Sequence, residues 1–518
     1  MKIKSILVPF SLILLVIISL ILRLYRLDLI QLYADEAGHY LLFHQIQSGG
    51  LHLYERLMTF TWVFGLNPFG IRSASAIYGS LFVVVAYYLG KNVVGVKVGL
   101  LSALITSILP SYFLLSRIGH THIQIVLILT TLSLSLLSKA KSTKTIIISL
   151  IPLMLASYTY FSLLVITPLF VSLVFIYCFR GSAKKIISHS WILLVAFLVI
   201  IGISMHYQVF DHKSRGMDLI IFNDVNTYAV SDEKRGLVLD LKIAPFIYNK
   251  ITANIDIFVK NYFSFYSPEW LFLKGDPILR HSTNTVGTLY PFLLPFLLLG
   301  IYHFYRFGSP HLKLYLTLWL LISPIPAAIT KDGGGYLLRA VTMVPVLVLW
   351  SAIGLSKIRT KWLPIFCLVA LYSVGRFFIE YHFVYPVQAF HSFEYGFKEL
   401  AKFQTDNKNS SILMVWQGSN QDLLFRIYQN TLPDAFYFPP KQFSLGKSEF
   451  YMTKDNLVFS AIKSSADLAE FQAKFKFEYL AIPDPYFYIF SPSVELKKRL
   501  VKEIMYPNKT VAFSIYKL

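Results

Sequence analysis

The sequence has few charged residues and lacks acidic residues over a long stretch. Charged residues make up 15% of the 518 positions, against roughly a quarter in ordinary soluble domains. No Asp or Glu occurs between Glu55 and Asp211, and 55% of all residues are hydrophobic. The composition therefore excludes an ordinary soluble enzyme, and its hydrophobicity excludes a disordered chain.

Cysteine is also scarce. The two cysteines, Cys178 and Cys367, each lie inside an apolar run. Two such isolated residues exclude a cysteine-rich metal motif and a disulfide framework. We expect both to be small side chains that face lipid or the protein core.

Basic residues outnumber acidic ones, with 48 Lys and Arg against 28 Asp and Glu and a formal net charge of +20. In a soluble chain this excess would suggest a nucleic-acid partner. Here the basic residues form short clusters between long apolar runs, which is the positive-inside pattern of a multi-pass membrane protein. The pattern accounts for the charge and predicts a lipid bilayer, and no nucleic acid, as partner.

Runs of about 20 mostly apolar residues are long enough to cross a bilayer. One uncharged run, 145–179, has basic clusters at both ends. If both clusters are cytoplasmic, this run crosses twice and turns near Tyr158–Phe161. The sequence then predicts eleven spans in total, and the remaining nine are 6–22, 73–90, 98–116, 122–138, 190–206, 287–304, 314–329, 340–355 and 362–379.

The orientation follows from the basic clusters. Six segments hold fifteen Lys and Arg and no acidic residue, and they are 1–5, 91–97, 139–144, 180–189, 303–313 and 356–361. The positive-inside rule places these segments in the cytoplasm. The N-terminus is then cytoplasmic. Because the number of spans is odd, the C-terminal part is extracytoplasmic.

Three pieces of the chain are predicted to face outward: the loops 23–72 and 207–286 and the tail 384–518. We predict a polytopic α-helical membrane module over residues 1–383 and an extracytoplasmic α/β domain over residues 384–518. The predicted strands of the tail are 411–416 and 510–516, and its predicted helices are 394–404, 466–475 and 494–504.

The first outer loop carries two adjacent carboxylates, Asp35 and Glu36, about a dozen residues beyond the first span. The segment 36–47 is typical of an amphipathic interfacial helix. Asp35 suits the N-cap of this helix and Glu36 its first turn. A capping carboxylate is also held rigidly, which suits a catalytic base.

Several short motifs occur in order along residues 15–360. They are Leu22-Arg23-Leu24-Tyr25 with Asp35-Glu36, Gly70-Ile71-Arg72, Leu114-Leu115-Ser116-Arg117, Ala156-Ser157-Tyr158-Thr159-Tyr160, Asp276-Pro277-Ile278-Leu279-Arg280-His281, Pro324-Ile325-Pro326-Ala327-Ala328 and Leu338-Arg339-Ala340. In this order the sequence resembles the membrane-embedded GT-C glycosyltransferases, in the family 39-like branch of protein O-mannosyltransferases and aminoarabinose transferases. The resemblance implies the GT-C type of membrane fold.

The resemblance also implies an inverting transferase, which moves a sugar from a polyprenyl-phosphate-linked donor to an extracytoplasmic acceptor hydroxyl. The acceptor class stays open between a lipid, a polysaccharide and a protein. A neutral hydroxyl needs a base, and a positioned carboxylate contributes typically 10²–10⁴-fold. Asp35 matches that base. Glu36 would orient the loop, or raise the proton affinity of Asp35 as a neighbouring like charge.

The leaving lipid phosphate should meet cations. The candidates, all predicted near outer span ends, are Arg117, Arg280, His281 and Arg339. Arg117 and Arg72 are weaker candidates for this role than the other three. The alternative for each arginine is an anchor at the membrane interface, and we expect that role for Arg23.

A divalent cation is an alternative that we rank below a metal-free site. Many relatives carry an acidic residue shortly after the third span, where this chain has His120 and His122. These histidines, with His39 near Asp35, could supply imidazole ligands. Their two-residue spacing without Cys or carboxylate neighbours is a weak signal, so no cofactor is predicted.

Other functions remain as alternatives. A transporter or lipid flippase would place ionisable residues inside the membrane, and the predicted spans hold almost none, with Arg376 as the exception. A polytopic anchor for a binding domain would not need eleven spans. A GT-C enzyme that uses a lipid-diphosphate donor is the alternative within the same class.

Overall fold

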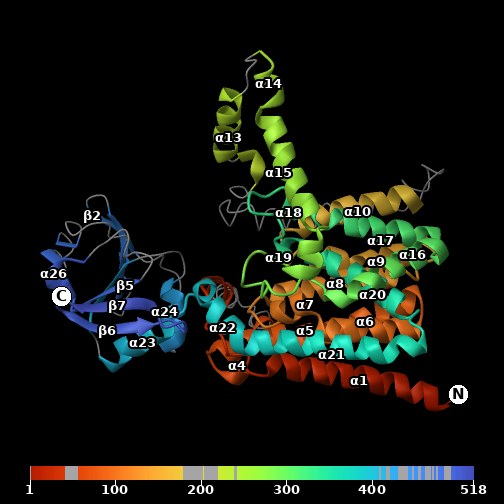
Figure 1. The fold of residues 1–518 in the computed structure, drawn as a ribbon, viewed down its shortest axis with the longest axis horizontal. Helices are drawn as coiled ribbons and strands as arrows, with labels where there is room; N and C mark the ends of the chain where they lie inside the picture. Colours follow the sequence, from red (N-terminus) through yellow and green to blue (C-terminus); the bar gives the residue numbers. More distant parts are fainter. Residues whose placement is uncertain are drawn as a thin grey trace. The chain divides into compact units, whose positions relative to one another are not determined.

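A computed structural model gives the fold of the chain (Figure 1). Within it, the described residues are 2–40, 56–178, 202, 220–223, 225–237, 242–407, 410–415, 421–429, 441–445, 448–452, 457–460, 468–469, 472–473, 476–483 and 492–518.

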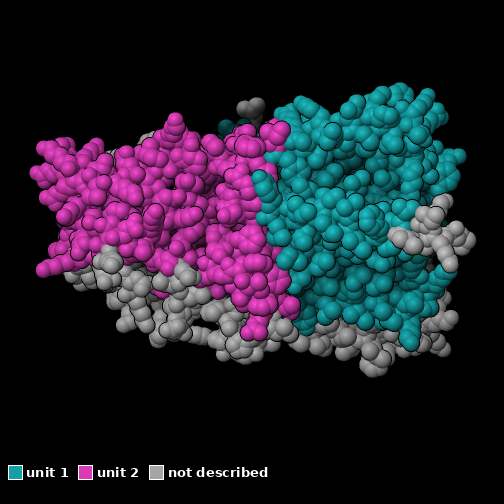
Figure 2. Space-filling view, turned by 90° about the horizontal axis from the view of Figure 1, so that it is seen from below, with its two compact units in different colours: residues 1–25, 75–378 teal, residues 26–74, 379–518 magenta. Residues whose placement is uncertain are grey.

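The chain divides into two compact units, which Figure 2 shows in separate colours. Unit 1 consists of residues 1–25 and 75–378, and unit 2 of residues 26–74 and 379–518. This division follows contacts within the protein. The predicted division at residue 383 follows membrane topology, and it stays a prediction.

Apolar helices build unit 1. Their sequences are apolar on most or all sides, as expected for helices that face either lipid or one another. The main helices, two of which extend beyond this unit at one end, are α1 (Lys2–Leu24), α5 (Pro68–Val93), α6 (Val96–Ile108), α7 (Pro110–Leu115), α8 (Thr121–Leu137), α9 (Thr143–Ala156), α10 (Leu163–Cys178), α16 (Leu294–Phe307), α17 (Pro310–Ile322), α18 (Ile325–Ala328), α19 (Leu337–Ala340), α20 (Val344–Leu355) and α21 (Leu363–Ile379).

The uncharged run 145–179 forms two helices, α9 and α10, as predicted. The turn between them covers residues 157–162 and includes the predicted turn positions. Four helical segments in the described part of the chain are long and apolar enough to cross a membrane: Leu7–Leu24, Pro68–Val93, Leu337–Leu355 and Thr360–Gln388. The number of eleven spans stays a prediction, and the predicted span 190–206 lies outside the described residues.

Two glycines let α16 and α20 pack at short range. A Cβ atom on Gly300 would lie 1.7 Å from the carbonyl oxygen of Trp350, and one on Gly354 would lie 1.9 Å from that of Phe296. Small residues allow this close backbone approach between apolar helices. The pair therefore fixes the spacing of two central helices of unit 1.

A helical hairpin leaves the bundle of unit 1. It consists of α13 (Val225–Gly236), α14 (Ala244–Ile247) and α15 (Lys250–Ser264), and α15 runs across the direction of the long bundle helices (Figure 1). Asn249 caps α15, because its side-chain oxygen accepts hydrogen bonds from the backbone N–H groups of Ile251 and Thr252 at 2.9 and 3.1 Å.

Unit 2 contains a seven-stranded mixed sheet of order β2-β3-β4-β1-β5-β7-β6. β1 runs parallel to β4 and β5, and the remaining neighbours are antiparallel. The strands are β1 (Ile412–Val415), β2 (Lys441–Leu445), β3 (Ser448–Met452), β4 (Leu457–Ser460), β5 (Tyr479–Pro483), β6 (Leu500–Met505) and β7 (Val511–Lys517).

The core of unit 2 joins this sheet to distant parts of the chain. Helices α23 (Phe397–Asp406) and α24 (Gln421–Gln429) contribute Leu400 and Phe425 to one apolar cluster with strand residues such as Met414. Leu32 and Ala37, from the start of the chain, belong to the same cluster. The segment before and after Asp35 is thus part of the core of unit 2.

The expectations for the tail are confirmed in three places and wrong in one. Strands β1 and β7 and helix α23 form where they were predicted. The predicted helix 494–504 is wrong, since α26 (Val494–Lys497) ends early and β6 follows it. The reason is a pairing remote in sequence, because β6 forms an antiparallel pair with β7. The predicted helix 466–475 lies mostly outside the described residues.

Candidate functional site

Asp35 and Glu36 lie in a short helix formed by residues 34–40 of unit 2. The side chain of Asp35 is exposed, whereas that of Glu36 is fully buried. Adjacent carboxylates therefore have opposite environments. Asp35 is accessible to a ligand, while Glu36 contacts only protein groups.

Arg72 holds Glu36 in a buried bidentate ion pair. Its Nε donates to Oε1 and its Nη2 to Oε2, both at 2.6 Å. The guanidinium also donates to the carbonyl oxygens of Leu27, Ile30 and Gln31. Because these hydrogen bonds compensate the burial of both charges, the pair fixes the loop that leads to the two carboxylates.

The C-terminal part of unit 2 holds the same loop from the other side. The backbone N–H of Leu32 donates to the hydroxyl of Tyr428 at 2.7 Å, and that of Ala34 donates to Glu394 Oε2 at 2.9 Å. Burial raises the pKa of Tyr428, so its hydroxyl stays neutral. These bonds reach the residue directly before Asp35.

His39 lies one helical turn after Asp35. Burial lowers the pKa of the His39 imidazole, while the carboxylates of Asp35 and Glu36 act in the opposite direction. Since burial is the larger effect, the neutral ring is favoured at pH 7. A neutral imidazole has one nitrogen lone pair for accepting a proton or a cation.

In unit 1, a second group of polar side chains begins with Asp276 and His281. Both are buried, and His281 Nδ1 lies 3.0 Å from Asp276 Oδ2. The carboxylate of Asp276 also accepts hydrogen bonds from the backbone N–H groups of Ile278 and Leu337, each at 2.7 Å. Asp276 therefore joins the segment that carries Arg280 to the start of α19.

Arg339 lies on α19 beside this dyad. Its Nη1 donates to Asp332 Oδ1 at 2.7 Å and to Thr330 Oγ1 at 2.6 Å. Its guanidinium carbon lies 4.5 Å from the centre of the Tyr336 ring. The Tyr336 ring is in turn 5.2 Å from the His281 ring. Arg339 and His281 thus flank one tyrosine.

Arg280 belongs to the same neighbourhood. It is half-buried and directly precedes His281 in the chain. Burial raises the pKa of Tyr336, and the charges of Arg339 and Arg280 partly oppose this rise. Three of the four predicted phosphate-binding residues therefore gather around Tyr336.

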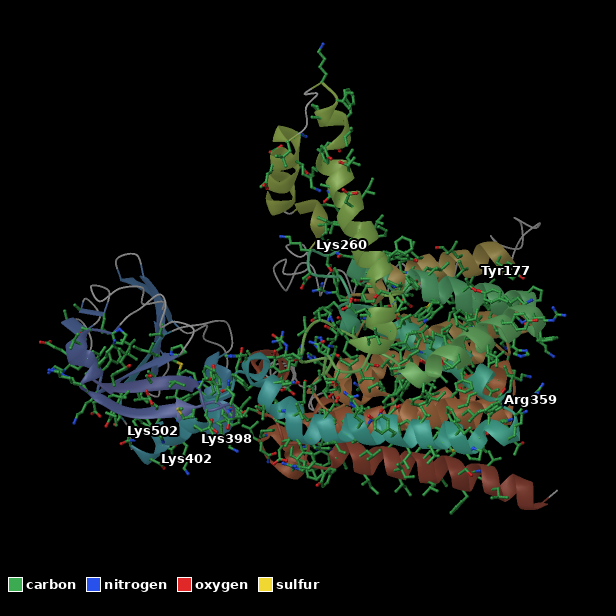
Figure 3. All side chains as sticks on the ribbon, viewed as in Figure 1. Tyr177, Lys260, Arg359, Lys398, Lys402 and Lys502 are labelled. Carbon is green, nitrogen blue, oxygen red and sulfur yellow. The ribbon has the colours of Figure 1, made fainter. Side chains whose placement is uncertain are left out.

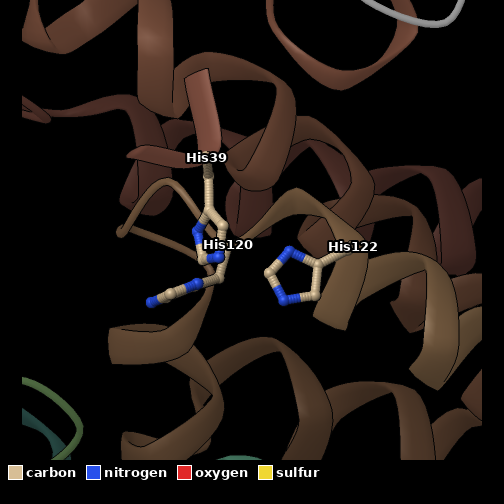
Figure 4. A group of neighbouring side chains, drawn as sticks. All are labelled: His39, His120 and His122. Carbon is tan, nitrogen blue, oxygen red and sulfur yellow. The ribbon is translucent and has the colours of Figure 1, made fainter. Parts of the chain in front are cut away.

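The turn between α9 and α10 adds Tyr160 to this group. Burial raises the pKa of Tyr160 to about 12, and the charge of Arg339 opposes the rise. The rings of His122 and Tyr160 lie 5.6 Å apart. The rings of His120 and His122, which Figure 4 shows, lie 5.4 Å apart. His39, also drawn in Figure 4, belongs to unit 2. The binding of a divalent cation by the three histidines stays the lower-ranked alternative.

Arg117 has a different environment from the other predicted cations. Its Nη1 donates to the carbonyl oxygens of Leu22, Arg23 and Tyr25 at 3.1, 2.7 and 2.8 Å. These carbonyls lie at the C-terminal end of α1, where helix geometry leaves acceptors without intrahelical donors. The geometry favours a structural role in fixing that helix end.

Arg23 is not an interface anchor, so that prediction is wrong. Its side chain is fully buried. Nε donates to Ser116 Oγ at 2.8 Å and Nη1 to the carbonyl oxygen of Ser107 at 3.0 Å. Polar groups on neighbouring segments thus replace the water that an interfacial arginine would contact.

Several polar residues of both groups were not candidates from the sequence. Asp276 could have been found, because it lies five residues before His281 in the same motif. Asp332 borders the glycine run before Arg339. Tyr428 and Glu394 carry no local signal, since their partners lie more than 350 positions away.

The chain combines a bundle of apolar helices with a C-terminal sheet domain, and its similarity to the solved structures of AglB and ArnT gives it the GT-C type of membrane fold. The archaeal oligosaccharyltransferase AglB from Archaeoglobus fulgidus, solved with an inhibitory peptide and a dolichol-phosphate, is similar at a TM-score of 0.52 and 14% identity. The match covers 98% of this chain and 74% of AglB.

ArnT from Cupriavidus metallidurans, solved with undecaprenyl phosphate, is similar at a TM-score of 0.53 and 11% identity, over 97% of each chain. Residues 57–207 match the family model described as dolichyl-phosphate-mannose-protein mannosyltransferase. No curated protein matches the sequence. The predicted resemblance to GT-C glycosyltransferases of the mannosyltransferase-like branch is therefore confirmed.

Proposed function

We propose that this protein is an inverting glycosyltransferase, with Asp35 as the general base that activates an extracytoplasmic acceptor hydroxyl. The observation that carries this proposal is the contrast between the two adjacent carboxylates. Glu36 is buried and neutralised by Arg72, while Asp35 is exposed in the first turn of a short helix, and the loop before this helix is fixed on both sides. A base needs this combination of access and rigid placement.

The donor of the proposed reaction is a polyprenyl-phosphate-linked sugar. AglB and ArnT were solved with dolichol-phosphate and undecaprenyl phosphate, and the fold of this chain resembles both. The predicted eleven spans and the positive-inside charge pattern support an outer location of the acceptor and of the C-terminal sheet domain. The lipid chain of the donor would stay in the bilayer.

Arg339 is the best-suited phosphate ligand among the predicted cations of the described chain. Its present anionic partner, Asp332, is 52% exposed. A phosphate oxygen could take the place of this carboxylate without leaving a buried charge unpaired. Arg280 and His281 would support it, whereas Arg117 would act through the position of α1.

In the proposed reaction, the acceptor oxygen attacks the anomeric carbon from the face opposite the lipid phosphate. The hydroxyl proton passes to the carboxylate of Asp35. The new carbon–oxygen bond forms as the bond between the anomeric carbon and the phosphate oxygen breaks. Polyprenyl phosphate leaves with the bonding electrons, and the guanidinium of Arg339 meets its negative charge.

The experiment compares Asp35→Asn with Asp28→Asn, a matched control because Asp28 is another exposed acid near the end of α1. Extracytoplasmic glycans and glycolipids are analysed by mass spectrometry at equal membrane abundance of each variant. Loss of the base should reduce transfer by about 10²-fold or more, while the control keeps transfer. Substantial transfer by Asp35→Asn would remove Asp35 from the role.

A single sugar missing from one acceptor class in the Asp35→Asn cells would name both substrates. Identical profiles in cells with the wild-type protein and cells with Asp35→Asn would instead favour the transporter or anchor alternatives. Accumulation of a lipid-diphosphate-linked glycan in the Asp35→Asn cells would favour the alternative donor class.

A further inference from the structure

Helix α15 presents an apolar face that no part of the described chain covers. Ile251, Ile255, Val259 and Phe263 are 71%, 54%, 44% and 61% exposed. Their spacing of four residues places them on one side of the helix. Such a continuous apolar stripe on a folded protein marks an interaction surface.

The tip of the hairpin continues this surface. Leu237, at the end of α13, is 78% exposed, and Phe246 and Ile247, on α14, are 82% and 50% exposed. Much of the hairpin extends beyond the helix bundle, so its side chains there do not contact the described bundle helices (Figure 3). Exposed apolar side chains therefore continue from α15 to α14 and to the residue that follows α13.

The opposite side of α15 is tied to unit 1. Asn261 is buried and its Nδ2 donates to the carbonyl oxygen of Thr330 at 2.8 Å. Ser264 Oγ accepts a hydrogen bond from the backbone N–H of Gly335 at 2.8 Å, and the indole N–H of Trp270 donates to the carbonyl oxygen of Gly335, also at 2.8 Å. These hydrogen bonds fix the rotation of α15 about its own axis. The apolar face of α15 is turned away from them.

The apolar face also continues onto a bundle helix. Tyr262, next to the stripe, donates through its hydroxyl to the carbonyl oxygen of Leu321, and Tyr266 donates to that of Leu320. Both acceptors lie at the end of α17, and the Leu321 side chain is 43% exposed. The stripe is thus continuous with the apolar outside of the helix bundle, which faces lipid in a membrane protein.

We propose that the hairpin α13–α15 docks on the surface of the lipid bilayer, with the apolar face of α15 inserted at the level of the headgroups. A helix with one apolar and one polar face lies in the plane of the interface. The direction of α15 across the bundle helices fits this placement (Figure 1). Asp256 and Lys260, both exposed on the remaining side, then face water.

The docked helix would set the depth of the loop that precedes Arg339. Asn261 and Ser264 hold residues 330–335 of this loop, and Arg339 pairs with Asp332 and Thr330 within it. The membrane surface would thereby position this cation at headgroup level. The docking itself does not depend on the proposed reaction.

The test uses the full-length protein with Cys178→Ala and Cys367→Ala, reconstituted in vesicles of phosphatidylcholine and phosphatidylglycerol. A nitroxide label is placed by Ile255→Cys or Val259→Cys on the apolar side, and by the matched controls Asp256→Cys or Lys260→Cys on the polar side. All four positions are exposed, so the labels do not disturb packing. Collision rates with oxygen and with a water-soluble nickel chelate are measured by electron paramagnetic resonance.

The expected result is that labels at 255 and 259 collide severalfold more with oxygen than with the chelate, while labels at 256 and 260 show the reverse. Equal exposure of all four labels to the chelate would overturn the proposal, because the apolar face would then be in water. Low collision rates with both reagents at 255 and 259 would also overturn it, since a protein partner or a second copy would then cover the face.

Discussion

At the scale of single residues, side chains of the same type perform different tasks because their environments differ. Arg23 and Arg72 are buried and donate to carbonyl, hydroxyl or carboxylate oxygens of the protein itself. Arg339 instead pairs with an exposed aspartate. The first two have structural roles, and we propose that the third exchanges its partner for a ligand.

The proposed role of Arg339 predicts an effect on donor binding. Arg339→Gln should weaken the affinity for the polyprenyl-phosphate donor about tenfold or more, which corresponds to about 1.4 kcal/mol or more, because one charge-assisted contact is lost. Binding of the donor to purified protein measures this. Asp332→Asn is the control, because it frees the guanidinium and should not weaken binding. Equal donor affinity of wild type and Arg339→Gln would make Arg339 an interface anchor.

The buried pair of Glu36 and Arg72 predicts an effect on stability. Glu36→Gln leaves the guanidinium of Arg72 buried without its anion, which costs about 3–5 kcal/mol. Thermal unfolding of the purified variant should show a clearly lowered midpoint. The double variant Glu36→Gln with Arg72→Met should regain part of the loss. A midpoint of Glu36→Gln equal to that of wild type would show that the pair is not desolvated.

At the scale of helices and strands, apolar patterns predict whether a helix or a strand forms better than they predict the residues at which it begins and ends. Helices α9 and α10 and their turn follow from flanking charge, and strands β1 and β7 follow from their apolar composition. The stretch 494–504 contains residues suited to a helix, yet β6 forms there because β7 provides a pairing partner. A pairing remote in sequence overrides local preference.

The contact between α16 and α20 predicts which glycines tolerate a side chain. Gly300→Ala should lower the free energy of unfolding by about 1–3 kcal/mol, because the added Cβ would overlap the carbonyl oxygen of Trp350. Gly375→Ala, on α21, is the control, since no atom lies within 4 Å of its Cβ position. Thermal unfolding in the same detergent compares both variants. An unchanged midpoint for Gly300→Ala would argue against the close packing.

At the scale of the whole molecule, unit 2 combines two parts of the chain that are far apart in sequence. Residues 26–40 share a core with α23, α24 and the sheet. The C-terminal domain therefore supports the loop that carries Asp35, in addition to any contact that it makes with an acceptor. Removal of the domain would take away this support.

This arrangement predicts a catalytic effect from a residue of the tail. Tyr428→Phe removes the hydroxyl that accepts the N–H of Leu32. The turnover number should fall severalfold while donor affinity stays the same, because the position of Asp35 changes and the donor contacts do not. Tyr479→Phe is the control, as its ring packs against the same core. An unchanged turnover number in Tyr428→Phe would confine its role to packing.

The sequence by itself determined the membrane class, the helical runs and the motifs that gather around Tyr336, because apolar length and charge clusters act locally. Only the tertiary structure decided that Glu36 is buried and Asp35 exposed, that Arg23 lies inside the bundle, and that residues 500–505 form a strand. Burial, ion pairing and strand pairing depend on groups that meet only after folding, so no local pattern of residues specifies them.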